Sequence, residues 1–246
     1  MTLLLASVRS LDEALLALDG GADLIDLKEP ARGALGALDH AAVRVSVQAI
    51  AARRPVSATI GDLPEMDPPA MIAAVERMAA TGVDYIKIGF FAHRRARACA
   101  AALSAMARQA RLVAVLFADE PCELNLLDAL AAAGFAGAML DTAGKTGGSL
   151  RDWRDALELR QFVDRTRALG LLSGLAGSLQ EADIEPLLEL SPDYLGFRGA
   201  LCAGRDRSQR LDARALRRIR SLIPAHHADA WAADQALRRA KAGSPA

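Results

Sequence analysis

Lysine is used sparingly in this chain, and its positions suggest a chemical role. Among 246 residues there are four lysines and 26 arginines. Lys28, Lys87 and Lys145 lie at or just after the end of a short apolar run, and Lys241 lies near the C-terminus. Arginine stays protonated, whereas an ammonium can lose its proton and become a nucleophile. We therefore expect the first three lysines to perform amine chemistry on a carbonyl group.

Two carboxylates accompany these lysines. Asp26 lies two positions before Lys28, so in a strand both side chains would share one face, and Asp141 lies four positions before Lys145. Each carboxylate alone is explained as readily by a structural hydrogen bond as by catalysis. Beside the lysines, they favour general acid and base catalysis or the positioning of an amine. Burial near a second cation would help an ammonium to lose its proton, whereas Asp26 would oppose that loss.

Short β-forming runs alternate with amphipathic helical runs along most of the chain. The expected strands are Leu3–Val8, Leu24–Leu27, Val56–Ile60, Tyr85–Ile88, Leu112–Phe117, Gly137–Leu140, Leu171–Leu175 and Tyr194–Phe197. The expected helices are Leu11–Leu18, Ala41–Ala52, Met71–Ala80, Arg97–Gln109, Leu124–Ala133, Trp153–Leu169, Glu181–Leu190 and Ala213–Ile223. Four of them should end at a glycine, namely Gly20, Gly82, Gly134 and Gly170.

Eight such units predict an α/β fold, a single (β/α)8 TIM barrel over residues 1–224. No GxGxxG motif opens the first helix, which argues against a dinucleotide-binding sheet. Residues 225–246 are expected to form a short C-terminal helical extension or to be partly disordered.

The barrel predicts where the polar side chains meet. Active sites of such barrels lie at the C-terminal ends of the strands, and alternate strands supply the same layer of the interior. Lys28, Lys87 and Asp141 belong to the second, fourth and sixth expected strands or to their ends. We therefore expect them in one site at the barrel mouth, with Lys145 reaching in from the loop after the sixth strand.

Two glycine-rich turns indicate a phosphate site. Gly174, Gly177 and Ser178 belong to the turn after the seventh strand, and Arg198 and Gly199 follow the eighth. Loops at these places commonly bind phosphate through backbone N–H groups, and glycine lets the backbone approach an anion closely. Arg198 could add a charge-assisted contact. Each turn alone is a weak signal, because glycine also serves tight turns.

The composition excludes several classes of partner. The formal net charge is zero and aromatic residues make up 4% of the chain, so neither a nucleic acid nor a membrane surface is an expected partner. The N-terminus resembles a first strand rather than a signal peptide, and no apolar stretch reaches the ~18 residues of a membrane span. These features predict a cytoplasmic protein. Barrel enzymes of this size often associate, so a homo-oligomer is expected.

Neither a metal nor another cofactor is expected. Cys99, Cys122 and Cys202 are widely spaced, without a CxxC pair, and are expected to be reduced core thiols. The histidines show no helical spacing typical of metal ligands.

Three segments together resemble a known family. They are Asp-Leu-Lys-Glu-Pro-Ala-Arg-Gly-Ala-Leu-Gly-Ala at 26–37, Tyr-Ile-Lys-Ile-Gly at 85–89 and Leu-Asp-Thr-Ala-Gly-Lys at 140–145. They are similar to the (5-formylfuran-3-yl)methyl phosphate synthases, also called 4-(hydroxymethyl)-2-furancarboxaldehyde phosphate synthases. The Gly-Leu-Ala-Gly-Ser-Leu and Gly-Phe-Arg-Gly-Ala-Leu segments also fit, and the resemblance covers residues 2–223.

The resemblance implies a TIM-barrel enzyme acting early in methanofuran biosynthesis. Such enzymes join two molecules of glyceraldehyde 3-phosphate into a furan aldehyde phosphate, with loss of phosphate and water. The resemblance makes Lys28 the Schiff-base lysine, with Asp26, Lys87, Asp141 and Lys145 as catalytic companions. The alanine- and arginine-rich composition is typical of a high-GC bacterium, and methylotrophic bacteria use a methanofuran-like carrier for one-carbon oxidation.

Three other functions remain open at this point. A different Schiff-base aldolase acting on a sugar phosphate would share the lysines but release an open-chain sugar. A phosphate-binding isomerase would use the lysines only as counter-charges and would form no covalent adduct. A barrel retained as a binding subunit would bind a triose phosphate without converting it, although clustered buried charges are costly without a function.

Overall fold

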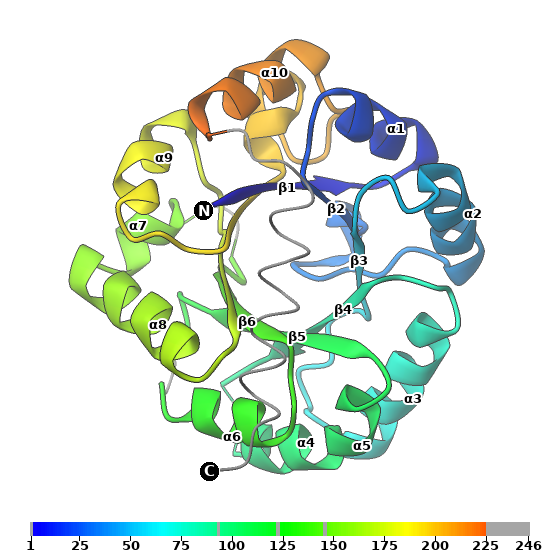
Figure 1. Cartoon of the computed structure of the whole chain (residues 1–246), viewed down its shortest axis with the longest axis vertical. Helices are drawn as coiled ribbons and strands as arrows, with labels where there is room; N and C mark the ends of the chain where they lie inside the picture. Colours follow the sequence, from blue (N-terminus) through cyan, green and yellow to red (C-terminus); the bar gives the residue numbers. More distant parts are fainter. Residues whose placement is uncertain (1, 93, 122–123, 145–146, 225–246) are drawn as a thin grey trace.

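Eight parallel strands close into a barrel, and helices surround it (Figure 1). The structure is a computed structural model and describes residues 2–92, 94–121, 124–144 and 147–224. Each strand pairs with the next along the chain, and β8 pairs with β1. The strands are β1 Leu3–Val8, β2 Leu24–Leu27, β3 Val56–Thr59, β4 Tyr85–Phe90, β5 Arg111–Phe117, β6 Gly137–Asp141, β7 Leu172–Leu175 and β8 Tyr194–Phe197. The predicted TIM barrel is thereby confirmed.

The helices lie outside the ring of strands (Figure 1). They are α1 Leu11–Asp19, α2 His40–Ile50, α3 Pro68–Ala79, α4 Ala96–Ala102, α5 Ser104–Ala107, α6 Leu126–Ala132, α7 Leu150–Trp153, α8 Ala156–Ala168, α9 Glu181–Leu188 and α10 Ala213–Leu222. Short 3-10 helices follow β2 and β8, namely η1 Pro30–Arg32, η2 Gly199–Leu201 and η3 Ala203–Arg205. The predicted extension over residues 225–246 lies outside the described residues.

Two of the predicted helices are each divided in the structure. Arg97–Gln109 becomes α4 and α5, and Trp153–Leu169 becomes α7 and α8. The second division has a local cause, because the Asp155 carboxylate accepts a hydrogen bond from the Glu158 N–H at 2.8 Å and the Glu158 carboxylate accepts one from the Asp155 N–H at 3.0 Å. This capping box starts a new helix within the predicted one.

Of the four predicted helix-ending glycines, Gly20 is the C-cap residue of α1, and the other three lie shortly after the C-caps of α3, α6 and α8. Gly82, Gly134 and Gly170 follow their helices with positive φ. After α1 the left-handed residue is Gly21, with φ of 82°, whereas Gly20 has φ of −79°.

The barrel has two separate apolar cores. One lies between the strands and the helices, and the other fills the barrel interior with side chains such as Leu3, Tyr85 and Tyr194. Gly174 belongs to this interior rather than to a phosphate-binding turn. It lies within β7, and a Cβ there would come within 2.3 Å of the Tyr194 ring. The expected phosphate role of Gly174 is therefore replaced by a packing role, because the strand needs a glycine where the tyrosine ring crosses the barrel.

Three aspartates at the N-terminal ends of the strands bond to the neighbouring strand in the same way. Asp23, Asp84 and Asp193 each lie directly before a strand, and each carboxylate accepts a backbone N–H near the start of the preceding strand, at 2.9, 2.9 and 2.8 Å respectively. Asp193 also accepts the Ser173 hydroxyl at 2.9 Å, and its own N–H donates to that hydroxyl at 3.0 Å. These bonds give partners to backbone N–H groups near the starts of β1, β3 and β7.

In the described ranges, no helix is both long and apolar enough to cross a membrane.

We predict that replacing one of these aspartates lowers the stability of the fold by an amount that depends on how deeply it is buried. Asp193 is 9% exposed and Asp84 is exposed, so Asp193→Ala leaves the Ser173 N–H without a partner away from water. We expect Asp193→Ala to lower the free energy of unfolding by about 2–3 kcal/mol and Asp84→Ala by about 1 kcal/mol or less. Urea unfolding of the two variants measures both values. Equal losses would show that burial does not determine the effect.

Candidate active site

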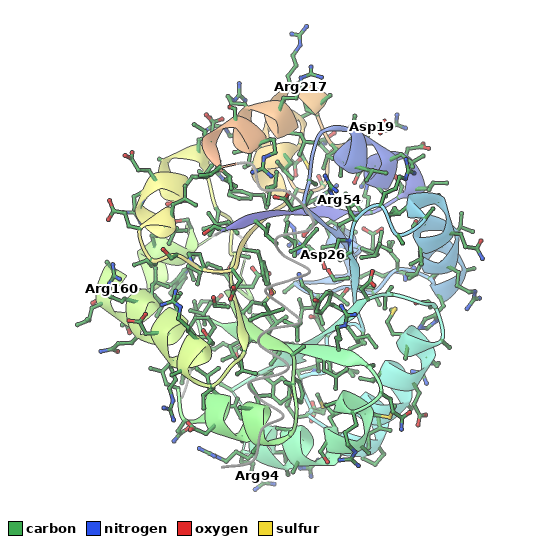
Figure 2. The ribbon with its side chains drawn as sticks, viewed as in Figure 1. Asp19, Asp26, Arg54, Arg94, Arg160 and Arg217 are labelled. Carbon is green, nitrogen blue, oxygen red and sulfur yellow. The ribbon has the colours of Figure 1, made fainter. Side chains whose placement is uncertain are left out.

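The centre of the site is a buried carboxylate flanked by two serines. The strand register aligns Ser7 of β1, Asp26 of β2 and Ser57 of β3 in one row across the barrel. The Ser7 hydroxyl donates to Asp26 Oδ2 at 2.8 Å, and the Ser57 hydroxyl donates to Oδ1 at 2.6 Å. Asp26 is 1% exposed and lies inside the ring of strands, whereas Arg160 and Arg217 project from the outer rim (Figure 2).

The serines were not singled out in the sequence. Their signal was weak, because small polar residues occur in many strands and only the lateral register shows that both face Asp26.

Lys87 forms a buried ion pair with Asp26. Its Nζ lies 3.0 Å from Asp26 Oδ1, and both side chains are almost fully buried. Burial acts to raise the pKa of Asp26, but the charges of Lys87 and Lys28 and the hydrogen bonds from Ser57 and Lys87 outweigh it. The pKa of Asp26 is therefore lowered, and the carboxylate remains ionised at neutral pH.

Lys28 and Asp141 form a second, looser pair. Lys28 Nζ lies 3.9 Å from Asp141 Oδ2, and the two residues are 8% and 4% exposed. Asp141 ends β6, and its Oδ1 accepts the Thr142 N–H at 2.7 Å. Lys28 follows β2, and its N–H donates to the Val8 carbonyl at 3.0 Å. The structure thus brings Lys28, Lys87, Asp26 and Asp141 together, whereas Lys145 lies outside the described residues.

A braced loop follows Lys28. Its backbone closes on itself where the Glu29 N–H donates to the Gly36 carbonyl at 2.7 Å, and the Thr59 hydroxyl donates to the same carbonyl at 3.0 Å. The Asp62 carboxylate accepts the N–H groups of Ala34 and Leu35 at 3.1 and 3.0 Å. The long segment after Lys28 is therefore fixed against β3 and its loop.

A cavity of about 150 Å³ adjoins the charged cluster. Its walls come from the strand ends and from the loops after β7 and β8. They include Ser7, Lys87, Asp141, Gly177, Ser178, Gln180, Arg198, Gly199, Arg205 and Arg207. The cavity thus places four of the residues predicted to bind phosphate beside two of the predicted catalytic residues.

The turn after β7 has a special backbone. Gly177 has φ of 108° and Ser178 has φ of 49°, so both residues occupy the left-handed region. A Cβ on Gly177 would lie 2.9 Å from the Thr142 side chain, which only glycine avoids. The Gly177 carbonyl accepts the Leu150 N–H at 2.8 Å. The turn is therefore held closely against the end of β6, beside Asp141.

Arg198 has a different role from the expected phosphate contact. Its Nη1 and Nη2 contact the two carboxylate oxygens of Glu13, and the remaining donors reach the carbonyls of Ser7, Arg207 and Gln209 at 3.2, 3.0 and 2.9 Å. These contacts engage all five N–H groups of a guanidinium. Although Arg198 lines the cavity, it holds the loop after β8 in place and directs no spare donor at an anion.

A larger hollow of about 420 Å³ lies between the loops after β4 and β5. Phe90, Phe91 and Phe117 line it, and none of the predicted site residues does. We locate the chemistry at the smaller cavity, because that is where the paired charges converge. Among the described residues, no three His, Cys, Asp or Glu side chains form a cluster that could hold a metal ion.

Comparison with known proteins gives the family of the chain. The family model described as 4-HFC-P synthase matches residues 4–220. A protein of Methylorubrum extorquens, provisionally named (5-formylfuran-3-yl)methyl phosphate synthase, is 48% identical over 230 residues, covering 92% of this chain and 94% of that protein. The (5-formylfuran-3-yl)methyl phosphate synthase of Methanothermobacter thermautotrophicus is 36% identical over 235 residues, covering 90% and 98%.

Solved structures agree with the fold. Phosphoribosyl anthranilate isomerase from Thermus thermophilus superimposes with a TM-score of 0.64 at 17% identity, covering 90% of this chain and 98% of that one. At such low identity the likeness concerns the barrel alone. The family model and the named relatives both extend over nearly the whole barrel and over the charged cluster at its mouth, and the chain belongs to the 4-HFC-P synthase family.

Proposed function

We propose that this chain is a (5-formylfuran-3-yl)methyl phosphate synthase that condenses two molecules of glyceraldehyde 3-phosphate, with loss of phosphate and water, in the biosynthesis of methanofuran or an analogue. The observation that carries the proposal is the buried cluster of two lysines and two aspartates beside the cavity at the barrel mouth. Its amines suit carbonyl chemistry, and its carboxylates suit the proton transfers that such a condensation requires.

Lys28 is the better nucleophile of the two lysines. The Lys87 ammonium lies 3.0 Å from Asp26, and the hydroxyl groups of Ser7 and Ser57 hold the Asp26 carboxylate in place. The Lys28 ammonium lies 3.9 Å from Asp141, and Lys28 is the more exposed of the two lysines. A lysine that attacks a carbonyl needs room to rotate toward it. A protonated imine on Lys28 would also keep the positive charge opposite Asp141, so covalent binding leaves the charge balance of the cluster unchanged.

The proposed reaction begins when Lys28 condenses with the aldehyde of glyceraldehyde 3-phosphate and releases water. Loss of the proton at C2 gives an enamine, which expels the C3 phosphate and leaves an enol whose C3 is nucleophilic. This carbon attacks the ketone of the second triose phosphate, which has isomerised to its dihydroxyacetone form. Ring closure of the free hydroxymethyl group on C2 and loss of two waters give the furan, hydrolysis of the imine releases the aldehyde from Lys28, and Asp141, Asp26 and Lys87 carry the protons.

Backbone groups suit the phosphate of the substrate. The turn at Gly177 and Ser178 and the backbone at Gly199 line the cavity beside Lys87 and Asp141. Successive backbone N–H groups in a turn can form a concave site that binds an anion. Lys145, predicted from the sequence to help, remains part of this proposal.

The first prediction concerns the product. Incubation of the purified chain with glyceraldehyde 3-phosphate alone should give a furan aldehyde phosphate and free phosphate. Mass spectrometry of the small molecules detects both. A sugar bisphosphate would instead indicate an ordinary Schiff-base aldolase, dihydroxyacetone phosphate alone would indicate an isomerase, and unchanged substrate would indicate a binding protein.

The second prediction concerns the covalent adduct. Borohydride reduction in the presence of substrate should add a triose phosphate to the unaltered chain at Lys28, because reduction fixes an imine permanently. Lys28→Arg keeps the charge opposite Asp141 but cannot form the imine, so it should give no adduct and should lower kcat by at least about 1000-fold. Peptide mass spectrometry locates the modification. An adduct on the variant would assign the nucleophile to another lysine.

The third prediction follows from the lowered pKa of Asp26. Asp26→Asn leaves Lys87 as a buried charge without its carboxylate, and we expect the free energy of unfolding at pH 7 to fall by about 3–5 kcal/mol. Because the folded-state pKa of Asp26 lies below its unfolded value, its stabilisation is complete above the unfolded pKa of about 3.9 and is lost as the pH falls through the folded pKa.

Urea unfolding over the acid range in which both proteins stay folded measures this difference. The gap between the unaltered chain and Asp26→Asn should narrow as the pH is lowered. A gap that widens on acidification would contradict the lowered pKa.

A further inference from the structure

Arg207 reaches across the barrel mouth from the loop between β8 and α10, and the sequence did not single it out. Its Nη2 donates to the Gly33 carbonyl, in the loop after β2, at 2.9 Å. The side chain lines the cavity that also contains Lys87, Asp141 and Ser178. Arg207 therefore joins the loop after β8, which lines the cavity, to the loop after β2.

The backbone that carries Arg207 is held by a buried ion pair. Arg198, paired with Glu13, donates from Nε to the carbonyl of Arg207 itself at 3.0 Å and from Nη2 to the carbonyl of Gln209 at 2.9 Å. The Glu13 carboxylate also accepts the Leu211 N–H at 3.2 Å. The loop is thus fixed at Arg207 and at two positions that follow it, Gln209 and Leu211.

The guanidinium of Arg207 keeps donors for a ligand. Within the described part of the chain, its side chain makes one hydrogen bond, the one to Gly33. Three other charged groups of the cavity wall have opposite charges beside them, because Arg198 has Glu13, Lys87 has Asp26 and Asp141 has Lys28. Arg205, which also lines the cavity, is exposed, whereas Arg207 is half-buried. Arg207 has no carboxylate in ion-pair contact among these described residues.

The chemistry of the ligand follows from these surroundings. Burial lowers the pKa of Arg207, and the charge of Arg198 adds to this shift, whereas the carboxylates of Asp141, Asp62 and Glu29 oppose it. Arginine nevertheless stays protonated at neutral pH. A half-buried guanidinium with unused donors, in a cavity that the Gly177–Ser178 turn also lines, matches a phosphate that accepts parallel hydrogen bonds.

We propose that Arg207 binds the phosphate group of a triose phosphate in this cavity, which the Gly177–Ser178 turn also lines. The identity of the substrate rests on the proposed function, whereas binding of the anion does not. Because Arg207 also contacts Gly33, an occupied site would link the loop after β8 to the loop that follows Lys28. The loop that follows Lys28 and the residue that contacts the phosphate would then be joined directly by the Arg207–Gly33 hydrogen bond.

Titration of the full-length chain with inorganic phosphate by isothermal calorimetry tests this inference without any turnover. Arg207→Gln should weaken phosphate binding by about tenfold or more, and Arg207→Lys should retain an intermediate affinity, because it keeps the charge but loses the paired donors. Arg210→Gln is the matched control, since Arg210 lies exposed in the same loop and does not line the cavity. It should bind phosphate like the unaltered chain.

Steady-state kinetics with glyceraldehyde 3-phosphate add a second measurement. Arg207→Gln should raise KM about tenfold with a smaller change in kcat, whereas Arg210→Gln should leave both unchanged. Three results would overturn the inference: equal phosphate affinity of Arg207→Gln and the unaltered chain, no phosphate binding by the unaltered chain, or an equal loss in Arg210→Gln. A fourth result would separate the two proposals. If the unaltered chain makes no furan but binds phosphate, and Arg207→Gln loses that binding, the phosphate-binding role of Arg207 is supported and the proposed function is refuted.

Discussion

The site depends on keeping one carboxylate ionised where water cannot reach it. Asp26 is 1% exposed, and an isolated charge at such a place would cost several kcal/mol. Ser7 and Ser57 supply hydrogen bonds to both oxygens, and Lys87 supplies the opposite charge at 3.0 Å. With the Lys28–Asp141 pair, the cluster holds two positive and two negative charges, so it is neutral as a whole. Each member is stable there because the others are present.

The barrel provides the geometry for this balance. Parallel register puts Ser7, Asp26 and Ser57 side by side on neighbouring strands, and the ends of β2 and β6 carry the second pair. Below them, apolar side chains with Tyr85 and Tyr194 fill the interior, so the polar groups can face only the mouth. The absence of a side chain at Gly174 is part of the same packing, because the Tyr194 ring occupies that volume.

The sequence predicted the barrel and four members of the cluster, and the reason lies in local signals. Buried parallel strands give continuous apolar runs, and a polar residue at the end of such a run is conspicuous, as at Lys28 and Asp141. Contacts between distant segments gave no such signal. Arg198 looked like a phosphate ligand because its partner Glu13 lies 185 positions away. Ser7 and Ser57 became visible only through the register, and Arg207 only through the path of its loop.

The two lysines illustrate how similar sequence contexts can have different physical roles. Both lie in or directly after a strand, and both have a carboxylate within ion-pair distance, but the partner of Lys87 is itself fixed by two hydroxyl groups. A short, fully bonded pair resists rearrangement, because any motion leaves a buried charge without its partner. The longer Lys28–Asp141 pair lies nearer to the solvent and can open at lower cost. Lys87 and Asp26 therefore suit a fixed electrostatic frame, whereas the Lys28 amine suits the role of nucleophile that we propose for it.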